Sequence, residues 1–230
     1  MPGLPADVET AIEGLYLAFA RYPLQQRIEA SPIVDVADAQ RRLRARPLRK
    51  LEAADLGVFA FKAMTTFGGV DDFRHFLPRI AELLSYGDAV GVCDLSLFIG
   101  KLGYGEWSTW SEDERGAVEL WLEALEDSYF RGDSRFDAID PLWDAALTRR
   151  STTRFIDRWL SSNAPSARHA LADALFAIAE SAQTGRTADG PPLIAHTDRV
   201  RNALARACQE SPDPHLRNAL LLTEFPPFTR

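Results

Sequence analysis

The sequence feature that most constrains the fold is the stretch 56–84, in which two helical apolar patterns meet at Gly68-Gly69. On each side of the glycines, apolar residues recur at the i, i+3, i+4, i+7 spacing of one helix face. They are Leu56, Phe59, Ala60, Ala63, Met64 and Phe67 before the glycines, and Val70, Phe73, Phe76, Leu77, Ile80, Leu83 and Leu84 after them. Glycine readily adopts the left-handed conformation that ends a helix, and acidic side chains favour the first turn of the next. The stretch therefore predicts an αα-hairpin.

The same period recurs along the rest of the chain and predicts further helices. They are expected near 7–21, 35–46, 94–102 and 111–131, from Asp140-Pro141 onward, around 155–160, near 165–184 and 200–208, and after Asp213-Pro214. No alternating pattern predicts a strand, and no fixed-period repeat is present. We therefore expect an all-α fold of about ten helices stacked as αα-hairpins, either irregular and helical-repeat-like or an orthogonal bundle.

Local signals mark several helix ends. Ser111-Glu112-Asp113-Glu114 is a capping box, in which the serine and the second glutamate satisfy each other's backbone amides. Asp140-Pro141 combines an N-cap residue with proline at the first helical position. Gly132 is expected to end one helix, and residues 185–192 are the expected loop. We predict a single domain over 1–230, with two helical halves, 1–132 and 133–230, as the alternative.

Composition limits the classes of function. No apolar run approaches the ~18 residues that span a bilayer, and the N-terminus lacks a signal-peptide pattern, so a soluble, cytoplasmic protein is expected. Cys93 and Cys208 form no CxxC pair and are expected to be free thiols rather than zinc ligands. The phosphate-binding, dinucleotide-binding and nucleophile-elbow motifs are absent. No cofactor and no metal are expected.

One histidine offers the alternative of an enzyme. Asp71, His75 and Glu82 form a stripe opposite the apolar face of their helix, at ~100° per residue. An aspartate four residues before a histidine could orient it for acid–base chemistry or share a metal. The competing interpretation is a solvated stripe with ordinary i, i+4 contacts, and no HExxH pattern is present. A metal- or water-assisted enzyme near His75 is therefore a second hypothesis.

Two neighbouring segments are typical of protein recognition. The loop 103–110 carries the aromatic residues Tyr104, Trp107 and Trp110 among glycines and hydroxyls, a composition common in recognition loops. The alternative is that the tryptophans fold inward and fill a helix junction. The helix that follows carries Glu119 and Glu123, and residues 106–144 hold twelve acidic residues against three arginines. This helix is either a solvated face or a surface that steers a basic partner.

The segment 41–50, RRLRARPLRK, has six basic residues and no acidic one. Phosphate or nucleic-acid binding there is a third hypothesis. The net charge of −7 and the lack of interleaved aromatic residues make nucleic acid an unlikely partner. Solvation, or pairing with the protein's own acidic groups, is the competing interpretation.

The runs FAFKAMTTFGGVDDFRHFLPRIAELL and KLGYGEWSTWSEDE resemble a group of uncharacterised bacterial helical proteins, over about residues 47–125. The group has no assigned activity, so the resemblance implies a bacterial, cytosolic, all-α protein and no catalytic residues. The main prediction is a non-catalytic interaction module, adaptor- or immunity-like. It would present Tyr104, Trp107, Trp110, Glu119 and Glu123 to another protein. The negative charge of this region favours a basic partner. The oligomeric state does not follow from the sequence.

Overall fold

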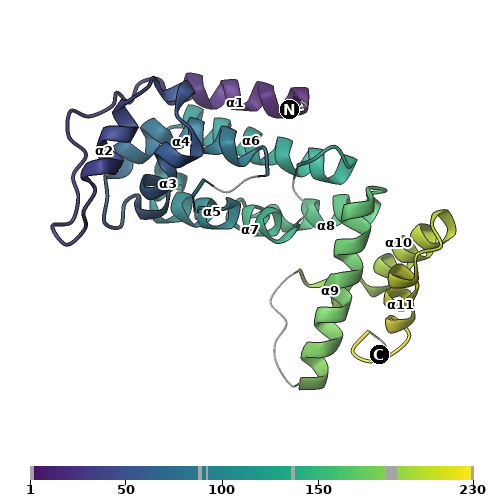
Figure 1. The fold of residues 1–230 in the computed structure, drawn as a ribbon. Coiled ribbons are helices and arrows are strands. Elements are labelled where there is room, and N and C mark those ends of the chain that lie inside the picture. The colour runs from purple at the N-terminus through teal and green to yellow at the C-terminus, as the bar shows by residue number, and fades with distance from the viewer. Residues whose placement is uncertain (1–2, 88–89, 92, 136–137, 185–190, 229–230) are drawn as a thin grey trace. The chain divides into compact units, whose positions relative to one another are not determined.

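The computed structural model describes residues 3–87, 90–91, 93–135, 138–184 and 191–228. Within these ranges the chain forms eleven α-helices, three short 3₁₀ helices and no strand, which confirms the predicted all-α class (Figure 1). The chain divides into two compact units, Met1–Glu126 and Asp127–Arg230. The division falls inside a helix rather than after Gly132. None of the described helices is both long and apolar enough to cross a membrane.

The first unit is built from six helices and two 3₁₀ helices. They are α1 (Ala6–Ala18), α2 (Ala37–Arg44), Leu48–Lys50, α3 (Ala53–Lys62), α4 (Val70–Leu84), α5 (Leu95–Tyr104), Trp107–Thr109 and α6 (Glu112–Arg131), which continues into the second unit. α4 packs against α1 and α3. The core is rich in aromatic rings: Phe59 and Phe76 lie 4.6 Å apart between centroids, and Phe98 meets Trp121 edge-on at 5.6 Å.

The predicted hairpin around Gly68-Gly69 is present, but its first helix is shorter than the apolar spacing indicated. α3 ends at Lys62, so Ala63, Met64 and Phe67 lie in the turn. Met64 is left-handed, with φ of 63°. The Lys101 ammonium of α5 donates a hydrogen bond to the Ala63 carbonyl over 2.9 Å. A partner distant in sequence therefore holds the backbone outside the helix.

Gly68 adopts the predicted left-handed conformation, but it lies in the turn rather than at the helix end, because α3 already ends at Lys62. Gly68 has φ of 75°, and a Cβ there would lie 2.9 Å from the Phe59 ring, so only glycine fits. Gly69 precedes α4, and its amide donates to the Asp72 carboxylate over 2.9 Å. Acidic residues thus occupy the first turn of α4, where the helix dipole favours them.

Most of the other predicted helix ends are confirmed, with one correction. The Ser111 amide donates to Glu114 over 3.0 Å, and the Glu114 amide donates to the Ser111 hydroxyl over 3.4 Å, as a capping box requires. Gly132, with φ of 85°, ends α6. Asp140, predicted as an N-cap, instead lies within the next helix, which Ile139 precedes. Residues 185–190 of the predicted loop lie outside the described residues.

The second unit contains α7 (Asp140–Thr148), α8 (Thr152–Ser161), α9 (Pro165–Thr184), the 3₁₀ helix Leu193–His196, α10 (Thr197–Glu210) and α11 (Pro214–Leu222). α7 packs on α8, and α10 contacts α8, α9 and α11. Figure 1 shows α9 and α11 side by side, in keeping with their extensive contact. The Trp159 indole donates to the Ala167 carbonyl over 2.8 Å and ties α8 to α9.

Candidate functional site

The loop 103–110 does not form the exposed aromatic surface that the sequence predicted, because both tryptophans are buried. Trp107 is 6% exposed and Trp110 is 4% exposed. The Trp110 indole donates to the Gly105 carbonyl over 2.9 Å, and its ring meets Phe19 edge-on at 5.7 Å between centroids. Of the three aromatic residues, only Tyr104 lies at the surface, at 62% exposed. The tryptophans therefore fill a helix junction, which was the alternative interpretation.

A buried carboxylate holds this loop against the chain that follows α1. Glu114 accepts hydrogen bonds from the Tyr22 hydroxyl at 2.5 Å and from the Ser111 amide. The Arg74 guanidinium lies over the rings of Tyr22 and Trp110, at 5.1 and 4.7 Å from their centroids. Burial raises the pKa of Glu114, but the hydrogen bonds from Tyr22 and Ser111 and the charge of Arg74 outweigh it, so the pKa lies below its usual value. These contacts fix the start of α6 to the segment that follows α1.

The predicted residues Glu119 and Glu123 lie together on the solvent side of α6. We call this side the acidic face; it consists of Glu112, Gly116, Glu119, Leu120 and Glu123, spaced so that they share one side of the helix. Leu120 is 62% exposed in the middle of this face. Apart from its chain neighbours and the backbone of its own helix, no atom lies within 4 Å of the position that a Cβ of Gly116 would take. The opposite side of α6 buries Val118, Trp121, Leu122 and Leu125 in the core.

The stripe of Asp71, His75 and Glu82 does not converge on one site. Asp71 pairs with Arg74 at 3.1 Å, while the His75 Nδ1 lies 2.7 Å from the Tyr22 carbonyl. Glu82 accepts a hydrogen bond from the Tyr16 hydroxyl at 2.6 Å and pairs with Arg79 at 2.7 Å. His75 and Glu82 are thus partly buried against neighbouring segments, so a fully solvated stripe was also wrong.

No metal cluster accompanies this stripe. Among the residues that the structure describes, no group of three or more His, Cys, Asp and Glu side chains is placed to hold a metal ion.

The arginines of segment 41–50 are engaged by the protein itself. Arg41 and Arg42 pair with Asp38, and Arg46 pairs with Glu52. Arg44 donates to the backbone carbonyls of Gln25, Gln26 and Gln40. Arg49 pairs with Glu13 at 2.6 Å, and its guanidinium lies 3.7 Å from the Tyr16 ring centroid. These contacts favour internal pairing over a free phosphate-binding cluster.

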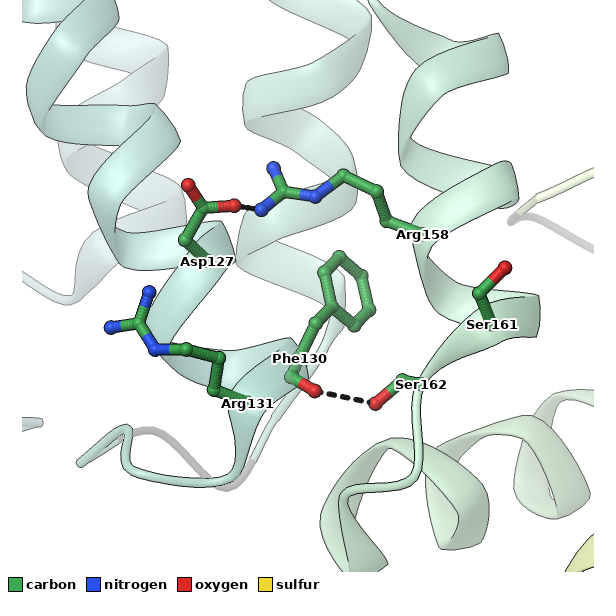
Figure 2. Close-up of a pocket in the computed structure, with 6 residues that line it drawn as sticks. All are labelled: Asp127, Phe130, Arg131, Arg158, Ser161 and Ser162. Atoms are coloured by element: carbon green, nitrogen blue, oxygen red, sulfur yellow. Dashed lines mark hydrogen bonds and ion pairs between the residues drawn. The ribbon is translucent and has the colours of Figure 1, made fainter.

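A pocket of about 380 Å³ lies in the second unit between the last turns of α6 and α8 (Figure 2). It is lined by Asp127, Phe130, Arg131, Arg158, Ser161 and Ser162. Figure 2 shows Arg158 reaching from α8 to the Asp127 carboxylate, with which it forms an ion pair. The Ser162 hydroxyl donates to the Phe130 carbonyl over 2.7 Å. Sequence analysis missed this pocket, because nothing in the sequence indicates that 127–131 meets 158–162.

The charged groups of the pocket are already balanced. Arg131 pairs with Asp133 at 3.2 Å, and Arg158 pairs with Asp127 while lying 5.8 Å from the Phe130 ring centroid. Both arginines occupy the last turn of a helix, where the dipole favours a cation. The pocket therefore joins two helix ends and offers no excess charge that would select an ionic ligand.

No family model, characterised protein or solved structure matches this chain significantly. The resemblance of residues 47–125 to bacterial helical proteins stays a prediction.

Proposed function

We propose that the chain is a non-catalytic protein-interaction module whose acidic face binds a basic segment of another protein. The observation that carries the proposal is a leucine exposed among carboxylates: Leu120 follows Glu119 directly and precedes Glu123 by three positions. A partner that covers Leu120 and brings lysine or arginine to the exposed carboxylate of Glu119 would match both the apolar and the acidic part of this face. The core of the protein needs neither the exposed leucine nor the exposed glutamates, because the opposite side of α6 supplies its apolar contacts.

Gly116 supports the same face. A glycine inside a helix costs about 0.5–1 kcal/mol relative to alanine. Because the space around its missing Cβ is open, packing within the protein does not require glycine there. Gly116 lies one turn before Leu120, so a partner's backbone can approach the helix closely beside the exposed leucine.

The expected binding energy is modest and depends on salt. Covering Leu120 stabilises a complex by about 1–2 kcal/mol, roughly a tenfold gain in affinity. The carboxylates attract a basic segment over a distance that salt shortens, from a Debye length of about 30 Å at 0.01 M to about 3 Å at 1 M. The charge therefore acts mainly on the rate of association. Tyr104 remains as an exposed second contact, whereas the buried Trp107 and Trp110 act only by holding the loop.

Photo-crosslinking from position 120 of the full chain in its native host tests the proposal. The matched control is position 147 on α7, where Leu147 is 50% exposed and lies outside the acidic face. We expect an adduct from position 120 only, attached to a peptide rich in lysine or arginine, with a yield that falls as salt rises. Identical adducts from both positions, or an attached peptide without basic residues, would contradict the proposal.

A further inference from the structure

Two histidine–aspartate pairs link α9 and α11 crosswise in the second unit. The Nε2 of His169 on α9 lies 2.7 Å from Oδ2 of Asp213, the residue that caps α11. The Nε2 of His215 on α11 lies 2.8 Å from Oδ1 of Asp173 on α9. The two imidazole rings stack between these contacts, with centroids 5.9 Å apart and planes 12° from parallel. Each side of the contact thus supplies one histidine and one aspartate.

The contacts of His169 specify its protonation state. Its Nδ1 lies 2.8 Å from the Pro165 carbonyl, which can only accept a hydrogen bond. The Asp213 carboxylate at its Nε2 is likewise an acceptor, and it already accepts the backbone amide of His215 over 2.8 Å. Because both ring nitrogens face acceptors, His169 makes both hydrogen bonds only as the imidazolium ion.

His215 differs in this respect. Its contact with Asp173 needs a proton on Nε2 alone, which the neutral imidazole can supply. The two hydrogen bonds of His169 therefore need two ring protons, whereas the hydrogen bond from His215 to Asp173 needs one.

We propose that His169 is the proton-sensitive part of a latch between α9 and α11, closed by the imidazolium ion and loosened by the neutral ring. Deprotonation leaves a nitrogen lone pair facing either the Asp213 carboxylate of α11 or, within α9, the Pro165 carbonyl, and in both cases it removes the positive charge that attracts Asp213. Loosening frees α11, which buries Leu216 and Ala219. The latch thus couples pH to the exposure of apolar surface on this helix.

The charged surroundings support a protonated His169. From α9, Asp173 adds a second negative charge near the ring, and Arg168 is paired with Glu210 of α10. From α10, the Cys208 thiol lies near Asp213 and Arg217 of α11, and burial raises its pKa, so that it stays neutral. The hydrogen bond to the Pro165 carbonyl raises the pKa of His169; burial opposes this, and the bond and charge of Asp213 add to it.

The direction of the pH effect follows from these shifts. A raised pKa means that the stabilisation by His169 is complete below its ordinary value of 6.5 and is lost as pH rises through the folded-state value. The pKa of Asp213 is lowered, chiefly by the His215 amide, so its contribution is present above 3.8 and is lost as pH falls through the folded-state value. The latch is therefore closed at mildly acidic pH and loosens on the alkaline side.

Amide hydrogen exchange of α11 in the full chain, corrected for the intrinsic rate at each pH, measures the latch. Between about pH 6 and pH 9 we expect the opening constant of α11 to rise, tenfold for each unit by which the His169 pKa exceeds 6.5. His169→Gln, which cannot be charged, should make opening independent of pH. The matched control, His215→Gln, should keep the pH dependence of the wild type.

Two results would overturn the latch. One is a wild-type pH dependence in His169→Gln, or its loss in His215→Gln. The other does not depend on the variants folding: in the wild-type protein, NMR titration of the His169 ring must give a midpoint above 6.5 that coincides with the opening of α11. A midpoint at or below that value contradicts the proposal.

Discussion

Replacing Trp110 with alanine tests whether the aromatic loop is part of the core. Trp110 is buried, meets Phe19 edge-on, lies under the Arg74 guanidinium and donates to the Gly105 carbonyl. Truncating a buried tryptophan costs about 3–5 kcal/mol. The same truncation in an exposed loop changes stability by no more than about 0.5 kcal/mol. Because domains are stable by only about 5–15 kcal/mol, the two outcomes are easily distinguished.

Urea unfolding of the full chain, followed by far-UV circular dichroism, provides the measurement. We expect the transition of the first unit in Trp110→Ala to move to a much lower urea concentration. Tyr104→Ala removes a comparable ring from the same loop at an exposed position, and it should stay within about 0.5 kcal/mol of the wild type. A Trp110→Ala protein as stable as Tyr104→Ala would refute the buried-loop interpretation.

The remaining predictions concern helix ends, a buried acid and solvent access. Gly132→Ala should destabilise the protein by about 1–2 kcal/mol, because φ is 85° and the new Cβ would lie 3.2 Å from Ala164. Gly100→Ala, which places its Cβ in open space within α5, should stabilise the protein by about 0.5–1 kcal/mol. Equal shifts of the thermal unfolding midpoint in the two variants would contradict this. The pKa of Glu114 is lowered, so its stabilisation of the fold is present above pH 4.5 and is lost as pH falls through the folded-state pKa. In Glu114→Gln the urea midpoint should therefore fall less steeply with decreasing pH than in the wild type. The same fall in both proteins would count against this. Iodide should quench the fluorescence of the native protein weakly, because all five tryptophans are buried; strong quenching would disagree.

The helices were predictable because their signals are local. The 3.6-residue period, the capping box at Ser111 and the glycine at 132 each act within a few neighbours along the chain. The end of α3 was not predictable in this way. Ala63 and Phe67 continue the apolar spacing, but a hydrogen bond from Lys101, far along the chain, takes the Ala63 carbonyl instead. Tertiary contact outweighed periodicity there.

In the candidate site, too, features set by neighbouring residues were predictable and features set by distant contacts were not. Helical spacing placed Glu119 and Glu123 on one side of α6, as the structure has them. The composition of loop 103–110 suits recognition and burial equally well, and the contacts of Trp110 with Phe19 and Arg74 decide for burial. The histidine pairs gave no signal, since His169 and Asp213 meet only when α11 packs on α9.

Recognition through the acidic face is tested most directly by the affinity of Gly116→Gln for the protein that crosslinks from position 120. Glutamine is a good helix former and finds open space at Gly116, so the fold is retained while the approach to Leu120 is blocked. We predict at least about tenfold weaker binding, with Gly100→Gln, another open helical glycine, binding as the wild type does. Equal affinities of the wild type and Gly116→Gln would contradict recognition through this face.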